Sequence, residues 1–206
     1  MRSAAEIVPE AYFDATAIVA DAPASVMPMT VIEAHLYAYL GCILGLFRGQ
    51  ALGDWGYRFA VTSEGFPYSV QFEAARTIVV ARGLVDEDGA GMMTARRDEL
   101  VAEIDSLLTM GSWADRRQWL RAATQCALAL PVGSIRHAIS QTPGLATSVR
   151  LGQRRLLLQA DDIDLIYEEY GVVSSVLGAN VKDLLSPAVI WLSARILRQE
   201  DVPVVD

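Results

Sequence analysis

The most apolar stretch of the sequence, residues 30–47, predicts a helix that is apolar on almost every face. Thr30 can cap this helix, and Glu33 three residues later completes a capping-box pattern. A helix without a polar face has to be surrounded by other parts of the protein. We therefore expect residues 30–47 to form the central helix of the fold, and Arg48 and Gly49 to end it.

A second helix is expected shortly afterwards. Residues 57–62 alternate in polarity as a short strand does, and Ser69 can cap a helix that runs to about Arg82. Gly83 can then supply the left-handed residue that commonly ends a helix.

A hairpin and a further helix should follow. Residues 84–85 and 92–93 are apolar and flank a loop rich in turn formers, residues 86–91. Thr94 is expected to cap a helix over residues 95–108. Helix, two-stranded wing and helix in this order are typical of a winged helix-turn-helix, in which the 30–47 helix would come first.

The remaining sequence predicts helices joined by short breaks. Periodicity, caps and breakers indicate helices at 113–130, 134–141, 147–158, 163–177 and 187–199. The fold class is thus mainly α, a winged helix-turn-helix with a small β-wing plus a C-terminal helical bundle. The expected division is an N-terminal arm (1–29), a winged-helix domain (30–110) and a helical domain (111–206). The arm either packs along its own domain, which we favour, or reaches a partner.

Charge argues against a protein that binds nucleic acid by itself. The 206 residues carry a formal net charge of −8, whereas neutralisation of phosphates needs a basic surface. The outward face of the 69–82 helix is expected to show Glu73, Arg76, Thr77 and Val80, a poor set for reading a DNA groove. The wing, residues 86–88, is acidic.

Arginines are the residues through which a nucleic acid or an acidic partner could still be bound. The candidates for such contacts are Arg76, Arg96, Arg97, Arg116 and Arg117. Arg116 and Arg117 are expected on the outside of the 113–130 helix. We favour two other uses of these arginines: pairing with the acidic residues at 161–169 of the same chain, or contact with an acidic partner surface.

Motifs of catalysis are missing from the sequence. Neither phosphate-binding loops, nor a nucleophile elbow, nor a metal-binding pair of histidines is present. Asp161, Asp164 and Glu168 could share a helical face and hold a divalent ion, but an acidic, solvated helix start is the simpler interpretation. We expect a protein that is not an enzyme and has no catalytic residues, cofactor or metal.

Targeting features are also missing. The most apolar window contains Glu33 and His35 and is too short for a membrane span, and residues 1–20 do not resemble a signal peptide. The prediction is a cytoplasmic protein without a membrane partner, in which Cys42 and Cys126 are buried free thiols.

Three short segments carry a resemblance to a known group of proteins. They are YRF at 57–59, GFPYS at 65–69 and ARGLV at 81–85, before the wing. They resemble the winged-helix segments of small bacterial accessory subunits, most closely the middle component of three-component, Lamassu-like defence systems built around an SMC-like ATPase. The resemblance implies a non-catalytic subunit that bridges the ATPase and an effector in antiphage defence, with DNA reached only indirectly through the complex.

Two functions therefore remain open: an interaction subunit bound to a larger protein, and a winged-helix transcription regulator that dimerises through its C-terminal helices. A mean hydropathy of +0.28 favours a protein partner, which can be a second copy of the chain. The surfaces expected to be covered are residues 7–19 and the last helix around Val189, Trp191 and Ile196.

Overall fold

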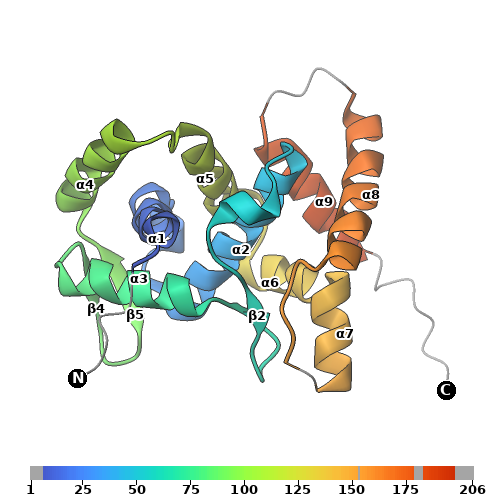
Figure 1. The fold of residues 1–206 in the computed structure, drawn as a ribbon, viewed down its shortest axis with the longest axis horizontal. Helices are drawn as coiled ribbons and strands as arrows, with labels where there is room; N and C mark the ends of the chain where they lie inside the picture. Colours follow the sequence, from blue (N-terminus) through green and yellow to red (C-terminus); the bar gives the residue numbers. More distant parts are fainter. Residues whose placement is uncertain (1–6, 153, 179–182, 198–206) are drawn as a thin grey trace.

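The computed structural model describes residues 7–152, 154–178 and 183–197, and this part of the chain is mainly helical with a small amount of antiparallel sheet (Figure 1). The α-helices are α1 (Pro9–Asp21), α2 (Val31–Phe47), α3 (Val70–Ala81), α4 (Arg97–Met110), α5 (Ala114–Ala129), α6 (Val132–Ser140), α7 (Pro143–Leu151), α8 (Ala160–Leu177) and α9 (Leu185–Leu197). Short 3-10 turns lie at Ala24–Val26 and Leu52–Trp55.

The strands are short and form two sheets. They are β1 (Met29–Thr30), β2 (Ala60–Val61), β3 (Pro67–Tyr68), β4 (Val85–Glu87) and β5 (Met92–Ala95). The first sheet has the order β1-β5-β4, in which Val85 pairs with Ala95 and Met29 with Met93. The second consists of β2 and β3, and an isolated antiparallel bridge joins Ala60 of β2 to Leu156.

The prediction for α2 is confirmed. Thr30 caps the helix, its side chain accepts a hydrogen bond from the Glu33 backbone, and the Glu33 carboxylate accepts one in return. Every residue from Ala34 to Phe47 is buried, and Leu40 and Leu44 have no exposed surface. An all-apolar helix does occupy the centre of the core, as its sequence requires.

A second buried helix was not expected. The segment interpreted as an arm contains α1, and its residues from Ala11 to Val19 are all buried. Figure 1 shows α1 nearly end-on, between α3 below and α4 and α5 above, and it contacts each of these helices. The small residues Ala11, Ala15 and Ala17 let neighbouring helices approach it closely. Residues 11–19 are therefore part of the core, which agrees with packing of this segment on its own domain, and they offer no surface for a partner to cover.

Among the boundaries that differ from the predictions are the start of α4 and the end of α7. Thr94 lies in β5, so α4 begins at Arg97 and Arg96 occupies the N-cap position. The helix expected over residues 147–158 begins earlier and ends at Leu151, because Gly152 adopts a left-handed conformation (φ 61°). The ends of α3, with Ser69 as N-cap and Arg82 as C-cap, are as predicted.

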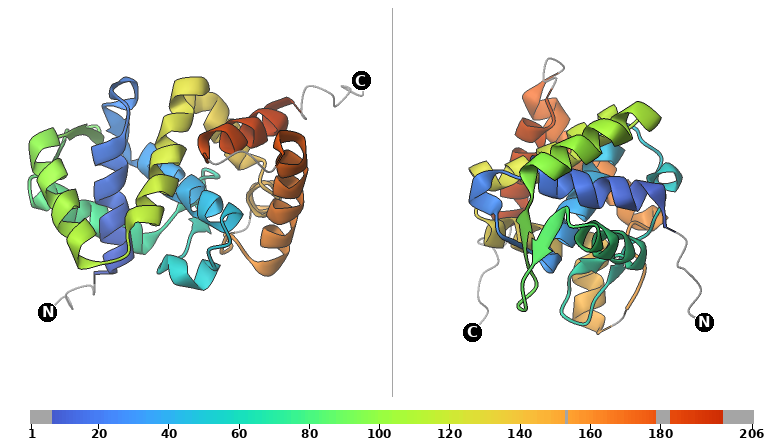
Figure 2. Two further views of the ribbon diagram at one scale, coloured as in Figure 1. Left: turned by 90° about the horizontal axis from the view of Figure 1, so that it is seen from above. Right: turned by 90° about the vertical axis from the view of Figure 1, so that its left-hand side faces the viewer.

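The C-terminal helices join the same core through α2 and α5. Helix α5 packs on α2 and α9, while α9 also contacts α6 and α8 (Figure 2). Phe47 at the end of α2 stacks on Tyr170 of α8 with ring centroids 4.0 Å apart, and it meets Trp191 of α9 edge-on. Cys42 and Cys126 are buried free thiols, as expected. Among the described residues, no helix has the length and apolarity needed to cross a membrane.

Candidate functional site

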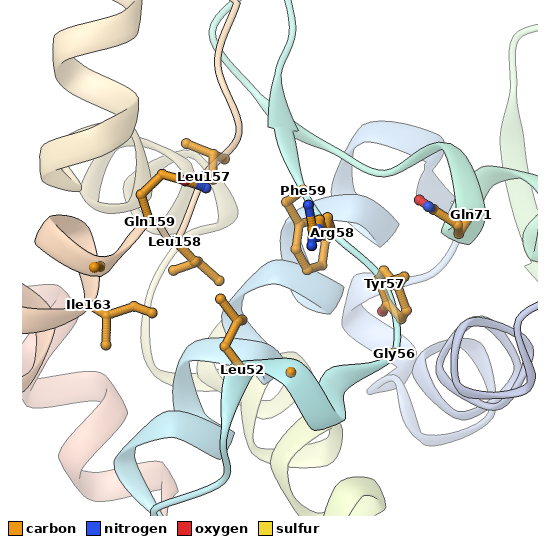
Figure 3. A pocket seen from close by; sticks show the side chains of 12 residues that line it. Leu52, Gly56, Tyr57, Arg58, Phe59, Gln71, Leu157, Leu158, Gln159 and Ile163 are labelled. Carbon is orange, nitrogen blue, oxygen red and sulfur yellow. The ribbon is translucent and has the colours of Figure 1, made fainter.

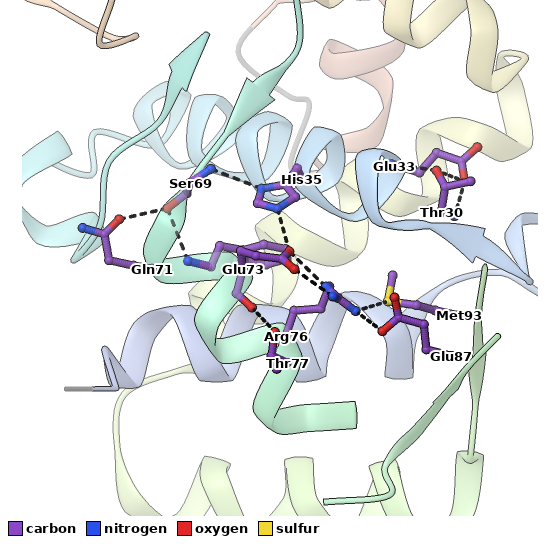
Figure 4. Close-up of polar contacts among 11 residues, drawn as sticks. Thr30, Glu33, His35, Ser69, Gln71, Glu73, Arg76, Thr77, Glu87 and Met93 are labelled. Atoms are coloured by element: carbon purple, nitrogen blue, oxygen red, sulfur yellow. Dashed lines mark hydrogen bonds and ion pairs between the residues drawn. The ribbon is translucent and has the colours of Figure 1, made fainter. Parts of the chain in front are cut away.

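The first candidate contact residue, Arg76, lies between α3 and the β4–β5 hairpin and does not point outward. Only 8% of it is exposed. Its guanidinium donates to both oxygens of Glu73, at 3.0 and 2.7 Å, and to Glu87 of β4 at 2.7 Å (Figure 4). Helical periodicity places Arg76 near the edge of the apolar face of α3. The β4–β5 hairpin covers this edge, so the Arg76 side chain is buried. The prediction of an outward Arg76 is wrong.

The same network extends to α2 through His35. The backbone N–H of Ser69 donates to His35 Nδ1 at 3.2 Å, so that Nδ1 carries no proton. His35 Nε2 therefore carries the proton and donates it to Glu73 Oε2, also at 3.2 Å. Burial lowers the pKa of His35 despite the neighbouring carboxylate. The contact with Glu73 is thus a hydrogen bond from a neutral imidazole, and it ties α2 to the first turn of α3.

Without Arg76, the outer surface of α3 offers no cation for DNA. Its exposed side chains are Val70, Gln71, Thr77 and Ala81. Arg82, at the C-cap, is held by the carboxylate of Glu103 in α4 and by the hydroxyl of Tyr12 in α1. This surface carries no charge, whereas a groove-reading helix usually presents positively charged hydrogen-bond donors.

The acidic groups of the β4–β5 hairpin are used within the chain. Asp86 accepts two hydrogen bonds from Arg96, at 2.9 and 2.6 Å, and both side chains are exposed. Asp88 accepts hydrogen bonds from the backbone N–H groups of Ala90 and Met92 and so closes the turn. Arg97 is exposed and has no ion pair with any residue in the described ranges.

Arg116 is also buried, contrary to the prediction that it lies outside α5. Its guanidinium donates to the two oxygens of Asp14 at 2.5 and 2.7 Å and to the Trp55 carbonyl at 2.8 Å. It stacks over the Trp55 ring, and Tyr57 donates its hydroxyl proton to Asp14 at 2.6 Å. Burial raises the pKa of the Asp14 carboxyl, and the hydrogen bonds from Arg116 and Tyr57 act against that rise.

The neighbouring Arg117 is half-buried and pairs with Asp21 at the end of α1. Of the candidate arginines, Arg76, Arg96, Arg116 and Arg117 thus each bind a carboxylate of the chain. They are divided between the hairpin and the α1–α5 contact, and they do not form one basic patch. These ion pairs lie within the chain, but their carboxylates belong to α1, α3 and β4 and not to residues 161–169, where the sequence suggested partners.

The carboxylates near the start of α8 are likewise divided. Asp162 accepts hydrogen bonds from Arg155 and from the Gln159 backbone, where it completes a capping box. Glu169 binds the Trp191 indole and Arg195 of α9. Asp161, Asp164 and Glu168 are exposed on α8. Nowhere in the described residues does a group of three acidic, histidine or cysteine side chains come together in a way that could hold a metal ion.

A groove of about 640 Å³ lies between the segment before β2 and the start of α8. Figure 3 shows Leu157, Leu158, Gln159 and Ile163 on one side and Tyr57, Arg58 and Phe59 on the other. Leu52 and Gln71 extend the lining. Arg58 is exposed, is the only charged side chain of the described residues that line the groove, and forms no ion pair with a described residue.

The groove exists because two chain segments meet and then separate. The Val61 N–H donates to Arg155 O and the Leu157 N–H donates to Phe59 O, which pairs the two segments. Leu158 then takes a left-handed conformation (φ 58°), which is unfavourable for a bulky side chain. This residue turns the chain from the pairing into α8, and the space opens beyond it. Sequence reasoning missed the groove, because only the long-range pairing of Ala60 with Leu156 creates it.

A second surface feature is a line of exposed aliphatic side chains on α8. Leu165, Val172 and Val176 are 43%, 62% and 75% exposed. Their spacings of seven and four residues place them on one face of the helix. The surface expected from the sequence is different: Trp191 is buried, and Val189 and Ile196 are half-buried. We call Leu165, Val172 and Val176 the α8 stripe.

Comparisons with known proteins identified no relative of this chain. No protein family model, no curated protein and no solved structure gave a significant match to the chain.

Proposed function

We propose that this protein is a non-catalytic interaction subunit that binds a larger protein through the α8 stripe. The observation that carries the proposal is the exposure of three aliphatic side chains on one helix face, rising to 75% at Val176. Apolar side chains aligned in this way leave water when a complementary surface covers them, and about 25 cal/mol is gained for each Å² buried. Contiguous exposed apolar surface typically marks an interface.

The distribution of charge supports a protein partner over a nucleic acid. The net charge of −8 repels a polyanion. Arg76 and Arg116 are buried in ion pairs and cannot reach phosphates. Around the α8 stripe, the exposed Asp161, Asp164 and Glu168 give the surface an acidic border. The expected partner surface is therefore an apolar centre bordered by basic side chains.

We also propose that the first half of the chain is a winged helix. The order α1, β1, α2, α3, β4, β5, together with the sheet order β1-β5-β4, supports this assignment. In this arrangement α1 is the first helix, which places part of the expected arm inside the unit, and α3 occupies the position of the recognition helix. The absence of an exposed cation along α3, among the described residues, makes α3 a protein-contact or scaffold helix in this proposal.

The partner that we propose is the one implied by the resemblance, an SMC-like ATPase, with this chain bridging it to an effector. The alternative function, a DNA-binding regulator, draws its support from the same winged-helix order. The regulator function requires a homodimer and a basic surface that contacts DNA. Such a basic surface is disfavoured because four of the candidate arginines already bind carboxylates of the chain, namely Arg76, Arg96, Arg116 and Arg117.

The experiment is affinity purification of a tagged copy from the organism that encodes the protein, followed by mass spectrometry. The proposal expects stoichiometric recovery of an SMC-like ATPase. Recovery of the tagged chain alone, or only as a homodimer, would contradict it.

A further inference from the structure

The groove beside Arg58 has no role in the proposed interaction through α8. Its volume of about 640 Å³ lies within the roughly 300–1,000 Å³ that small-molecule sites occupy. The apolar part of its wall is made by Leu52, Leu158 and Ile163 together with the aromatic residues Tyr57 and Phe59, and polar surface makes up about as much of the wall. The polar side chains that line it are Arg58, Gln71 and Gln159, and none of these is an acid.

We propose that the groove is a binding site for a small organic monoanion with an apolar body and a single carboxylate. Arg58 supplies the charge. Its guanidinium forms no ion pair with a described residue, and it has the planar pair of donors that a carboxylate matches. The apolar body of the ligand lies along the half-buried side chains of Leu52 and Ile163, and the amide groups of Gln71 and Gln159 bind further polar atoms.

The backbone of Leu158 is a second observation at the same place. A left-handed conformation is strained at a bulky residue such as Leu158, and such conformations gather at ligand-binding sites. The Leu158 side chain is only 2% exposed, so tight packing holds this conformation. Since this turn opens the groove, the strain and the cavity belong to one feature.

The composition of the groove defines the ligand by exclusion. A cation would meet Arg58 and no carboxylate among the lining residues. A nucleoside polyphosphate carries several negative charges, but the groove offers one arginine. The remaining negative charges of the ligand would have no cationic partner among the lining residues. A neutral apolar molecule would leave Arg58 without a partner. One carboxylate on an apolar body satisfies both parts of the lining.

The test uses three probes with the same eight-carbon chain and different head groups: octanoate, 1-octanol and octylammonium. Binding is followed by amide chemical-shift changes of the ¹⁵N-labelled full chain. We expect saturable binding of octanoate to one site, with shifts at Arg58 and Ile163, and at least about tenfold weaker binding of the alcohol and the amine.

Two variants complete the test. Arg58→Glu should weaken octanoate binding by at least about tenfold, whereas Arg97→Glu, an equal charge change at an exposed arginine of α4, should leave it unchanged. Gln71→Trp, at an exposed lining residue, should fill the groove. It should therefore weaken octanoate binding although Arg58 is still present. Absence of octanoate binding at millimolar concentration, or equal binding by wild type and Arg58→Glu, would overturn the proposal.

Discussion

The guanidinium group of Arg116 in α5 donates two hydrogen bonds to the carboxylate of Asp14 in α1, a residue 102 positions earlier in the chain. Neither side chain is accessible to bulk water, since Asp14 is 0% and Arg116 6% exposed. This pair joins the segment that the sequence presented as an arm to the helix that leads into the C-terminal half.

Loss of one partner of this pair should be severe. Arg116→Ala leaves the Asp14 carboxylate buried without its charged partner and with only the Tyr57 hydroxyl, among the described residues, as a side-chain hydrogen-bond donor. We expect the free energy of unfolding to fall by about 3–5 kcal/mol. Urea denaturation of wild type and variant measures this change. Arg121→Ala, at an exposed position of the same helix, is the control and should change stability by less than about 0.5 kcal/mol.

The position of α2 in the core gives a second prediction. Leu40 has no exposed surface, so Leu40→Ala should lower the free energy of unfolding by about 2–5 kcal/mol through lost burial and a cavity. The matched control is Leu128→Ala, since Leu128 is 62% exposed on α5. A loss below about 1 kcal/mol in Leu40→Ala would show that α2 is not the centre of the core.

The His35–Glu73–Arg76 network predicts a pH dependence of stability. Burial acts to raise the pKa of Glu73, but hydrogen bonds from His35 and Arg76 outweigh it and lower the pKa from 4.5 to about 2. A carboxyl whose pKa is lower in the folded state stabilises the fold above its unfolded pKa. This contribution should therefore be complete above pH 4.5 and lost as the pH falls towards 2.

His35 acts in the same direction in a higher pH range. Its pKa is lowered from 6.5 in the folded state, so its contribution should be lost as the pH falls below 6.5. Urea denaturation at a series of pH values measures both. Glu73→Gln should be less stable than wild type at neutral pH and should lose less stability below pH 4.5. Parallel curves for the two proteins would contradict this assignment.

A further prediction concerns DNA. Because the exposed side chains of α3 are neutral and the net charge is −8, the isolated protein should not bind duplex DNA specifically near physiological salt. Fluorescence anisotropy with labelled duplexes is the measurement. A sequence-dependent complex of sub-micromolar affinity that Thr77→Glu abolishes would establish α3 as a reading helix. Thr77 is a better position for this test than Arg76, because Thr77 is exposed. Substitution of Arg76 would also break its ion pair with Glu87 of the hairpin.

Local signals in the sequence predicted the helices from α2 onward but missed α1, and long-range contacts account for the misplaced arginines. Thr30 with Glu33, and Ser69 with Gly83, act on neighbouring residues, and α2 and α3 begin and end as predicted. Arg76 and Arg116 lie at the edge of an apolar helix face, where periodicity cannot decide between solvent and a covering segment. Partners elsewhere in the chain, Glu87 and Asp14, decide it.

The groove and the α8 stripe were beyond sequence reasoning for a related reason. The groove depends on the bridge between Ala60 and Leu156 and on the backbone of Leu158, and no local pattern announces either. The stripe depends on which face of α8 is left open after Phe47 stacks on Tyr170. The apolar surplus of the sequence predicted covered surfaces at residues 7–19 and on the last helix, whereas the three exposed aliphatic side chains of the stripe lie on α8.

The most direct test of the proposed function is a comparison of two charge substitutions in the affinity purification. Val176→Glu alters the most exposed residue of the α8 stripe, and Leu128→Glu introduces the same group at a 62% exposed leucine of α5. We predict that the large partner is lost with Val176→Glu and retained with Leu128→Glu, while both variants keep the circular dichroism spectrum of wild type. Equal recovery of the partner with Val176→Glu and wild type would contradict binding through α8.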